Sequence, residues 1–241
     1  MSTVRTDEVG RFERLAASWW DSHGPMRPLH VVNTLRMGYV LGQIARRFER
    51  RPGALQSLRI ADIGCGAGLM CEPLAQRGAT VVGIDAAANN IAAARLHAHA
   101  GGLRIDYRFG EPRAALRPDE RFDVLLLLEV VEHVSDVPAF VRDAAAHLAP
   151  GELLLASTLN RTLRSYLAAI VGAEMVFRVL PRGTHQWAQF VRPAELEQAA
   201  MACGLNPIER RGMAYLPAVH RAWWTRNQAV NYIASFGQPR S

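Results

Sequence analysis

Lysine is absent from this sequence, so all 28 of its basic residues are arginines. They outnumber 22 acidic residues, which gives a formal net charge of +6 and an isoelectric point of about 9.9. A charge of that sign favours anionic partners such as nucleic acids or lipid surfaces. However, the total absence of one basic residue indicates a bias in genomic base composition, so we base no functional assignment on the bulk charge.

Cysteine is scarce, and long apolar runs are missing. The three cysteines show neither C-x-x-C pairing nor zinc-type spacing, and their odd number favours a reducing compartment. Residues 1–10 are charged without an apolar core, so no signal peptide is expected. The apolar segments 124–128 and 167–171 are far shorter than the roughly 20 residues that span a bilayer. We therefore expect a cytoplasmic protein whose membrane contact is at most peripheral.

Apolar strands and helical patterns alternate along the middle of the chain. Continuous apolar strands such as residues 124–128 are typical of parallel strands that helices cover on both faces. The sequence therefore predicts an α/β fold with a doubly wound, mostly parallel sheet. Strands are expected over residues 58–64, 80–86, 103–109, 124–128 and 152–158, and helices over 69–77, 90–100, 137–148 and from about Pro193.

The length and composition fit one domain, with 49% hydrophobic and 21% charged residues. Between Asn160 and Val191, an insertion of about thirty residues follows a strand at the edge where open sheets bind ligands. The segments we expect are a helical cap over residues 1–57, a core over 58–159, an insertion or lid over 160–191, and a last helix with strands over 192–241.

A glycine-rich loop follows the first predicted strand, and an acidic residue ends the second. The loop, Asp62 to Gly68, has the form D-x-G-x-G-x-G, and Asp85 lies 21 residues after Gly64. Glycines let a backbone turn tightly and approach a ligand closely, while an acid at the end of the next strand can accept both hydroxyls of a ribose. The pattern therefore predicts a site for a nucleoside-containing cofactor.

Two details favour S-adenosylmethionine over a dinucleotide. The third glycine, Gly68, comes one residue earlier than in the G-x-G-x-x-G fingerprint of NAD sites. Asp62 would repel a pyrophosphate but suits a ligand with an amino group and a sulfonium. The loop is similar to motif I of class I methyltransferases. That resemblance implies a Rossmann-like, seven-stranded sheet, with cofactor contacts at Asp62, Gly64, Gly66 and Asp85.

Three side chains that can bind a metal or take a proton follow the strand at residues 124–128. Glu129, Glu132 and His133 have the i, i+3, i+4 spacing of one helical face, beside the expected cofactor crevice. Two carboxylates and an imidazole can hold Mg²⁺ or another divalent cation, and Glu132 or His133 can act as a general base. Acidic residues in a first helical turn also stabilise the helix dipole, so a structural role stays open as well.

The same region lacks the motifs of nucleic-acid methylation. No Pro-Pro-aromatic motif, typical of amino-directed nucleic-acid methyltransferases, follows the strand, and no Pro-Cys nucleophile for attack on a cytosine carbon occurs there. We therefore expect an oxygen acceptor and no nucleic-acid partner.

The insertion contains a basic apolar segment over residues 161–182. Its apolar residues recur at helical spacing, arginines lie at both ends, and Glu174 is its only acid. Such a segment can lie on an anionic bilayer, although a helix of this kind is more often packed on its own domain.

Further motifs occur along nearly the whole chain. They are Phe12, Trp19-Trp20-Asp21, Pro28-Leu29-His30, Leu35-Arg36-Met37-Gly38-Tyr39, Ala94 to Ala98, Glu129 to His133, Ser157 to Arg161, Val171 to Glu174, Pro181 to His185, Pro193 to Leu196 and Val230-Asn231-Tyr232. With these motifs and the glycine loop, the chain resembles the ubiquinone biosynthesis O-methyltransferase family, which makes both O-methylations of the quinone head group.

The resemblance implies roles for individual residues and partners. It implies a polyprenyl phenol or quinol substrate, whose insoluble tail favours peripheral contact of residues 161–182 with an anionic membrane at the inner face of the cell membrane. A complex with other ubiquinone-biosynthesis enzymes is also expected. Arg36, Gly64, Asp85 and Leu128 would contact S-adenosylmethionine, and Glu129, Glu132 and His133 would form the family's metal triad.

The reaction implied is methyl transfer from S-adenosylmethionine to a catechol oxygen, with either a cation at the triad or a proton acceptor at His133 or Glu132. Two alternatives stay open. One is a methyltransferase for another small phenol or acid. The other is a non-catalytic subunit of a quinone-biosynthesis complex, which only Gln186 and Leu216 favour, because the family usually has Asp and Asn there.

Overall fold

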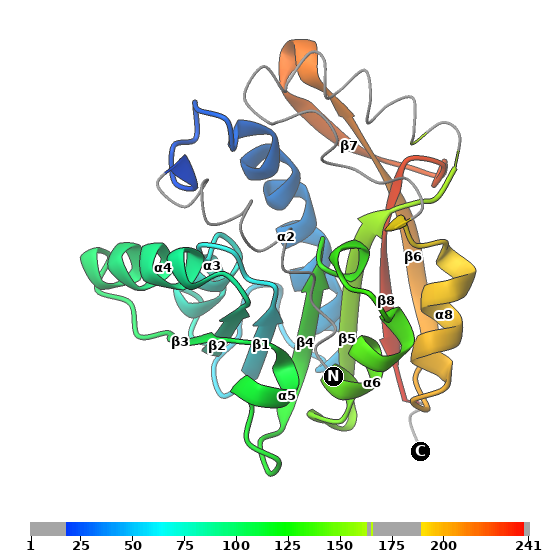
Figure 1. The fold of residues 1–241 in the computed structure, drawn as a ribbon, viewed down its shortest axis with the longest axis horizontal. Helices are drawn as coiled ribbons and strands as arrows, with labels where there is room; N and C mark the ends of the chain where they lie inside the picture. Colours follow the sequence, from blue (N-terminus) through cyan, green and yellow to red (C-terminus); the bar gives the residue numbers. More distant parts are fainter. Residues whose placement is uncertain (1–17, 163–164, 166–188, 239–241) are drawn as a thin grey trace.

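The computed structural model describes residues 18–162, 165 and 189–238 (Figure 1). Its centre is an eight-stranded sheet with the order β3-β2-β1-β4-β5-β8-β6-β7. The first five strands of the chain run parallel: β1 (Arg59–Ile63), β2 (Thr80–Asp85), β3 (Asp106–Phe109), β4 (Phe122–Leu128) and β5 (Leu148–Leu159). The last three pair antiparallel: β6 (Asn206–Leu216), β7 (Arg221–Thr225) and β8 (Asn231–Gly237).

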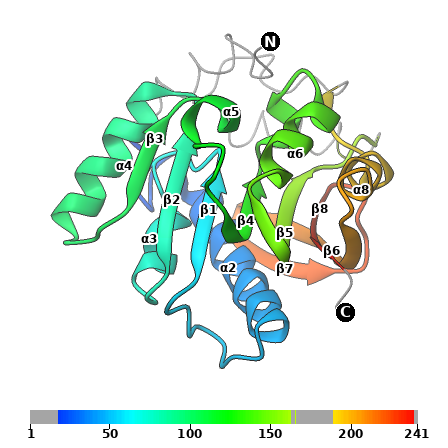
Figure 2. The same ribbon diagram turned by 90° about the horizontal axis from the view of Figure 1, so that it is seen from below.

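Helices cover both faces of the sheet, as Figure 2 shows from below. The helices α2 (Arg27–Arg47), α3 (Cys71–Ala75) and α4 (Ala88–Ala100) pack on one face. The other face is covered by α5 (Pro112–Ala115), α6 (Val137–Ala145) and α8 (Pro193–Met201). Two short 3-10 helices, η2 (Val131–His133) and η4 (Pro217–Val219), follow β4 and β6.

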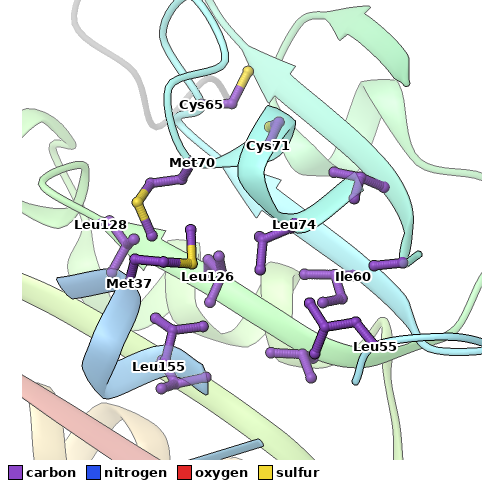
Figure 3. Close-up of a cluster of buried hydrophobic side chains, with 14 of the residues drawn as sticks. Met37, Leu55, Ile60, Cys65, Met70, Cys71, Leu74, Leu126, Leu128 and Leu155 are labelled. Carbon is purple, nitrogen blue, oxygen red and sulfur yellow. The ribbon is translucent and has the colours of Figure 1, made fainter. Parts of the chain in front are cut away.

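Strand β4 explains why the sheet has a core on each side. Successive side chains of a strand point to opposite faces. Leu126 and Leu128 therefore join the core under α2 and α3, shown in Figure 3, while Leu125 and Leu127 join the core under α6 and α8. All four leucines are buried. A continuous apolar strand is thus required by burial on both faces, as the sequence predicted.

The predicted doubly wound α/β fold is confirmed, and two of its details are wrong. The sheet has eight strands rather than seven, because Pro217 ends β6 and the chain turns back through η4 to add β7 as an antiparallel partner. Strand β5 begins at Leu148 rather than at residue 152, and it runs through Gly151, whose φ of 83° suits a glycine within the strand.

The topology places the carboxyl ends of the parallel strands along one edge of the sheet. The chain passes from β1 to β2 on one side, whereas β4 lies on the other side of β1. A crevice forms at such a reversal of strand order, outside the carboxyl ends of the strands. Within the described ranges, no helix combines the length and the apolarity needed to cross a membrane.

Candidate cofactor and acceptor site

The glycine loop lies between β1 and α3, and its glycine positions are too tightly packed for a side chain. Gly64 and Gly66 have φ values of 81° and 55°, which L-residues with a Cβ rarely adopt. A Cβ on Gly64 would lie 2.6 Å from Cγ2 of Val130, and a Cβ on Gly66 would lie 2.7 Å from Cη2 of Trp19. The loop is therefore in contact with two elements, the segment after β4 and the amino-terminal cap.

Asp85 ends β2 and is held by three N–H donors. The backbone N–H of Gly66 donates to Oδ2 over 2.9 Å, and the backbone N–H of Ala87 donates to Oδ1 over 2.9 Å. The side-chain amide of Asn90 also donates to Oδ1, over 3.1 Å. Burial raises the pKa of Asp85, and these three donors oppose that rise by stabilising the carboxylate. The carboxylate is thus fixed in orientation at the edge of the crevice.

Asp62 lies at the carboxyl end of β1, with only 2% of its surface exposed. The thiol of Cys71 donates to Asp62 Oδ2 over 3.4 Å. The pKa of Asp62 is raised to about 7, mainly by burial and in smaller part by the nearby charge of Asp85. A cationic ligand beside this carboxyl would lower its pKa. The contact of Asp62 with the cationic end of a cofactor stays a prediction, which affinity measurements can test.

Glu129, directly after β4, is turned toward the α2 helix. Its backbone has a φ of 54°, a left-handed conformation that is unfavourable for a residue with a side chain. Its carboxylate forms an ion pair with Arg36 over 2.6 Å and accepts a hydrogen bond from Ser157 Oγ over 3.0 Å. Strain at one residue is thus offset by two polar contacts.

Arg36 comes from the middle of α2 and is 3% exposed. One terminal nitrogen pairs with Glu129, and the other donates to Asn33 Oδ1 over 3.0 Å. Its buried Nε has no hydrogen-bond partner among the described residues. A buried N–H donor without a partner is costly, so this guanidinium is suited to an additional acceptor.

Glu132 lies within η2 and is 3% exposed. Its Oε2 accepts a hydrogen bond from Thr158 Oγ1 over 2.8 Å. Burial raises the pKa of Glu132 to about 7, the charge of Glu129 adds to the rise, and His133 opposes it. A carboxyl with this pKa can take up or release a proton near neutral pH.

The prediction that one helical turn carries Glu129, Glu132 and His133 on one face is wrong. The turn is the three-residue helix η2, which begins at Val131, and the left-handed Glu129 precedes it. Glu129 is engaged by Arg36 and Glu132 by Thr158. In the part of the chain that the structure describes, no three His, Cys, Asp or Glu side chains are grouped so as to hold a metal ion.

The other predicted site residues divide into three groups. His133 lies near both Asp85 and Glu132, because the positive charge of its protonated ring lowers the pKa of each carboxyl. Leu128 has its side chain in the core near Met37, at the carboxyl end of β4 (Figure 3). Phe12, Gln186 and most of the basic apolar segment 161–182 lie outside the described residues.

Sequence reasoning assigned no individual role to Ser157, Thr158, Trp19 or Asn90. Ser157 and Thr158 are hydroxyl residues at the end of an otherwise apolar strand, a signal that could have paired them with the acids after β4. Asn90 follows Asp85 by five residues in the next helix. The role of Trp19 depends on a contact 71 residues away, which no local pattern reveals.

Comparison with known proteins identifies the family. A family model described as a methyltransferase domain matches residues 36–210. The ubiquinone biosynthesis O-methyltransferase of Methylobacterium nodulans is 50% identical over 240 residues, which cover 98% of this chain and 96% of the relative. The enzyme of the same name from Cereibacter sphaeroides is 46% identical, with 99% of this chain and 98% of the relative covered.

Solved structures support the fold. Magnesium protoporphyrin IX methyltransferase from Synechocystis, with bound S-adenosylhomocysteine, superimposes with a TM-score of 0.68 over 97% of this chain and 95% of that chain, at 19% identity. A methyltransferase from Thermotoga maritima, described as a possible histamine N-methyltransferase, gives a TM-score of 0.62 over 96% and 100%, at 16% identity. These structures show the fold, and the full-length relatives show that the chain belongs to the ubiquinone biosynthesis O-methyltransferase family, on a class I methyltransferase fold.

Proposed function

We propose that this protein transfers the methyl group of S-adenosylmethionine to a ring oxygen of polyprenyl catechols in ubiquinone biosynthesis, namely 2-polyprenyl-6-hydroxyphenol and 3-demethylubiquinol. One observation carries the proposal. The glycine loop donates a hydrogen bond to an anchored carboxylate, Asp85, and packs on Val130, two residues before Glu132, a carboxyl with a near-neutral pKa. Cofactor binding and proton removal are thus provided on two sides of one loop.

The cofactor would be held by groups that the fold orients in advance. Asp85 would accept a hydrogen bond from the ribose hydroxyls at Oδ2, because its three N–H donors use both lone pairs of Oδ1 and only one of Oδ2. Backbone atoms of Gly64 and Gly66 would approach the ligand where no Cβ intervenes. Arg36, with its unpartnered Nε, would bind the carboxylate of the methionyl group.

The reaction would be a direct displacement at the methyl carbon. A catechol oxygen forms the new C–O bond while the C–S bond breaks, and the electron pair of that bond stays on sulfur, which gives neutral S-adenosylhomocysteine. The phenol proton passes to Glu132, whose raised pKa makes it a base of matching strength, or to the neighbouring His133. Holding both reactants on one sheet edge lowers the entropic part of the barrier.

A divalent cation at Glu129, Glu132 and His133 is a separate part of the proposal. The donor set of two carboxylates and one imidazole suits such an ion. As the structure places these side chains, they do not form a metal-binding group, because Glu129 pairs with Arg36. We therefore derive no step through a metal, and activity after exhaustive chelation tests whether one is needed.

Contact with an anionic membrane is proposed from the substrate and from one described surface. A polyprenyl tail is insoluble in water, so the substrate resides in a bilayer. At the end of the β6–β7 hairpin, Leu216, Val219 and Trp223 are 47%, 56% and 46% exposed. Apolar side chains at an exposed tip, beside Arg221, suit an anionic lipid surface. Flotation with anionic liposomes at low salt tests this contact, and absence of binding would contradict it.

Labelled methyl transfer tests the function. Purified protein is incubated with S-adenosylmethionine carrying a labelled methyl group, a short-chain prenyl catechol and magnesium. We expect label on a ring oxygen. S-Adenosylhomocysteine binding without transfer would favour another phenol or acid as acceptor, or the non-catalytic subunit, over the proposed substrate.

A further inference from the structure

Two adjacent tryptophans of the amino-terminal segment close on the cofactor loop. The ring of Trp19 covers Gly66, and the indole N–H of Trp20 donates to the carbonyl oxygen of Ala67 over 3.1 Å. Trp20 also stacks on His97 of α4, with ring centroids 3.5 Å apart and an interplanar angle of 1°. The tryptophan pair therefore joins the cap to the loop and to α4.

Trp19 makes a polar contact of a different kind. Its indole N–H donates to Asn90 Oδ1 over 3.0 Å, and both residues are buried, with 7% and 1% of their surfaces exposed. The other side-chain atom of the same amide, Nδ2, donates to Asp85 Oδ1 over 3.1 Å. A chain of two hydrogen bonds thus runs from the cap to the carboxylate at the end of β2.

The donor and acceptor groups fix the direction of both hydrogen bonds. A carboxamide can turn over and exchange its oxygen with its nitrogen, and an oxygen facing Asp85 would repel the carboxylate instead of donating to it. An indole can only donate, so Trp19 accepts one orientation of Asn90 alone. In that orientation the amide nitrogen must face Asp85.

We propose that Trp19 is a positioning residue for ribose recognition, acting through Asn90 to hold the Asp85 carboxylate in place for a ribose hydroxyl of the cofactor. This inference rests on the proposed role of Asp85 in binding S-adenosylmethionine. It assigns to the amino-terminal cap a part in cofactor affinity that is separate from covering the site. Trp20 holds the loop by its backbone and has no contact with Asn90 among the described hydrogen bonds.

Calorimetric titration of the full chain with S-adenosylhomocysteine tests the proposal. Trp19→Phe keeps a ring over Gly66 and removes the N–H, so we expect affinity to fall about five-fold, the size of one neutral hydrogen bond. Asn90→Ala should lower affinity at least as much. The double variant should bind no more weakly than Asn90→Ala alone, because Trp19 acts only through Asn90.

Matched variants distinguish an effect through Asn90 from a general destabilisation of the loop. Trp20→Phe removes a neighbouring indole N–H from the same loop, and its effect should add to that of Asn90→Ala. Glu197→Gln changes a surface ion pair with Arg210 and should bind like the wild type. If Trp19→Phe fails to fold, replacement of Trp19 by benzothienylalanine keeps the indole shape without the N–H.

The pH dependence of affinity gives a second signature. Asp85 accepts the ribose hydroxyls as a carboxylate, so binding weakens on acidification, and loss of an oriented donor should move this weakening to higher pH. The other ionisable groups whose charges couple to Asp85 among the described residues are Asp62, Cys65 and His133, and all are unchanged in Trp19→Phe.

The outcomes are distinct. Wild-type affinity in Trp19→Phe, or losses that multiply with Asn90→Ala, would overturn the positioning role while leaving the cofactor site intact. Failure of the wild type to bind S-adenosylhomocysteine would overturn the proposed cofactor site and this inference together.

Discussion

The carboxyl ends of β2 and β4 each present a buried or partly buried acid, and the two acids are held in opposite ways. Asp85 accepts three N–H donors from three other residues, whereas Glu132 has one hydroxyl donor, from Thr158, besides a hydrogen bond from its own backbone. Several donors fix a carboxylate and oppose the effect of burial on its pKa. Burial is the largest cause of the raised pKa at both acids, and with the Glu129 charge beside it the pKa of Glu132 rises to about 7.

This difference assigns different chemistry to two residues of the same kind. An anchored carboxylate suits recognition, because its lone pairs point in fixed directions. A carboxyl that titrates near neutral pH suits proton transfer. The two ends are also in physical contact, because Gly64 of the loop packs on Val130 of the segment that carries Glu132. Breaking one end should therefore affect binding, and breaking the other should affect turnover.

Glu132→Gln should give the largest effect. The amide keeps the shape of the side chain and can still accept the Thr158 hydrogen bond, but it cannot take the phenol proton. We expect kcat to fall about 100- to 1000-fold, typical of a lost general base, while affinity for S-adenosylhomocysteine changes less than about two-fold. Single-turnover methyl transfer and calorimetry measure the two quantities. Glu197→Gln, in a surface ion pair with Arg210, is the control and should keep full activity.

A kcat within a few-fold of wild type in Glu132→Gln would transfer the role of base to His133 or to another group. In that case the contrast between the two acids would lose its functional meaning.

Gly64→Ala tests the contact between the two ends. The substitution places a Cβ 2.6 Å from Val130 Cγ2 at a φ of 81°. Backbone strain and overpacking together should lower the free energy of unfolding by roughly 2–4 kcal/mol, measured with urea. Gly102→Ala is a matched control, because Gly102 has a φ of 66° with open space around it. It should cost only about 1 kcal/mol, the part due to strain. Equal losses in both variants would show that the contact with Val130 contributes nothing.

The two ends also differ in how far the sequence predicts them. The loop and Asp85 follow from spacing along one strand-helix-strand unit, so their union is a local property of the chain. The spacing of the acids after β4 predicts a regular helical turn, but the left-handed backbone of Glu129 is incompatible with a helix. Its partners Arg36 and Ser157 come from α2 and β5, and such distant pairings depend on tertiary packing. Strand β7, by contrast, is local: it pairs with β6 through the turn at Pro217–Val219, a signal that the prediction of seven strands did not use.

The pH dependence of the free energy of unfolding should distinguish Asp62, at the start of the glycine loop, from the other acidic residues. Below about pH 4, Asp62 is protonated in both the folded and the unfolded chain. As the pH rises, the unfolded chain ionises first, and the folded chain follows only near its pKa of about 7. Stability due to Asp62 is therefore complete below pH 4 and is lost progressively between pH 4 and 7, by at most about 1.4 kcal/mol per pH unit.

Asp62→Asn cannot ionise, so its free energy of unfolding should lack this decline. Urea unfolding of the unliganded chain at several pH values between 4 and 8 measures both slopes, and the difference isolates Asp62 from Glu132, which titrates in the same range. Parallel slopes in the two proteins would mean that Asp62 ionises alike in the folded and unfolded chains.

Thr158→Val should give the smallest effect on activity and the most specific test of Glu132 as the general base. The valine keeps the volume of the side chain and removes the hydroxyl that donates to the carboxylate over 2.8 Å. Because that hydrogen bond lowers the pKa of Glu132, its loss should raise the pKa above about 7. A general base acts when it is deprotonated, so the acidic limb of the kcat profile should move to higher pH by about half a unit to one unit, with the plateau at high pH nearly unchanged.

Ser157→Ala removes the neighbouring hydroxyl, which donates to Glu129, and should leave the position of the limb where it is in the wild type. A limb that moves equally in both variants would trace the titration to the whole acidic segment, whereas a limb that moves only in Thr158→Val assigns it to Glu132.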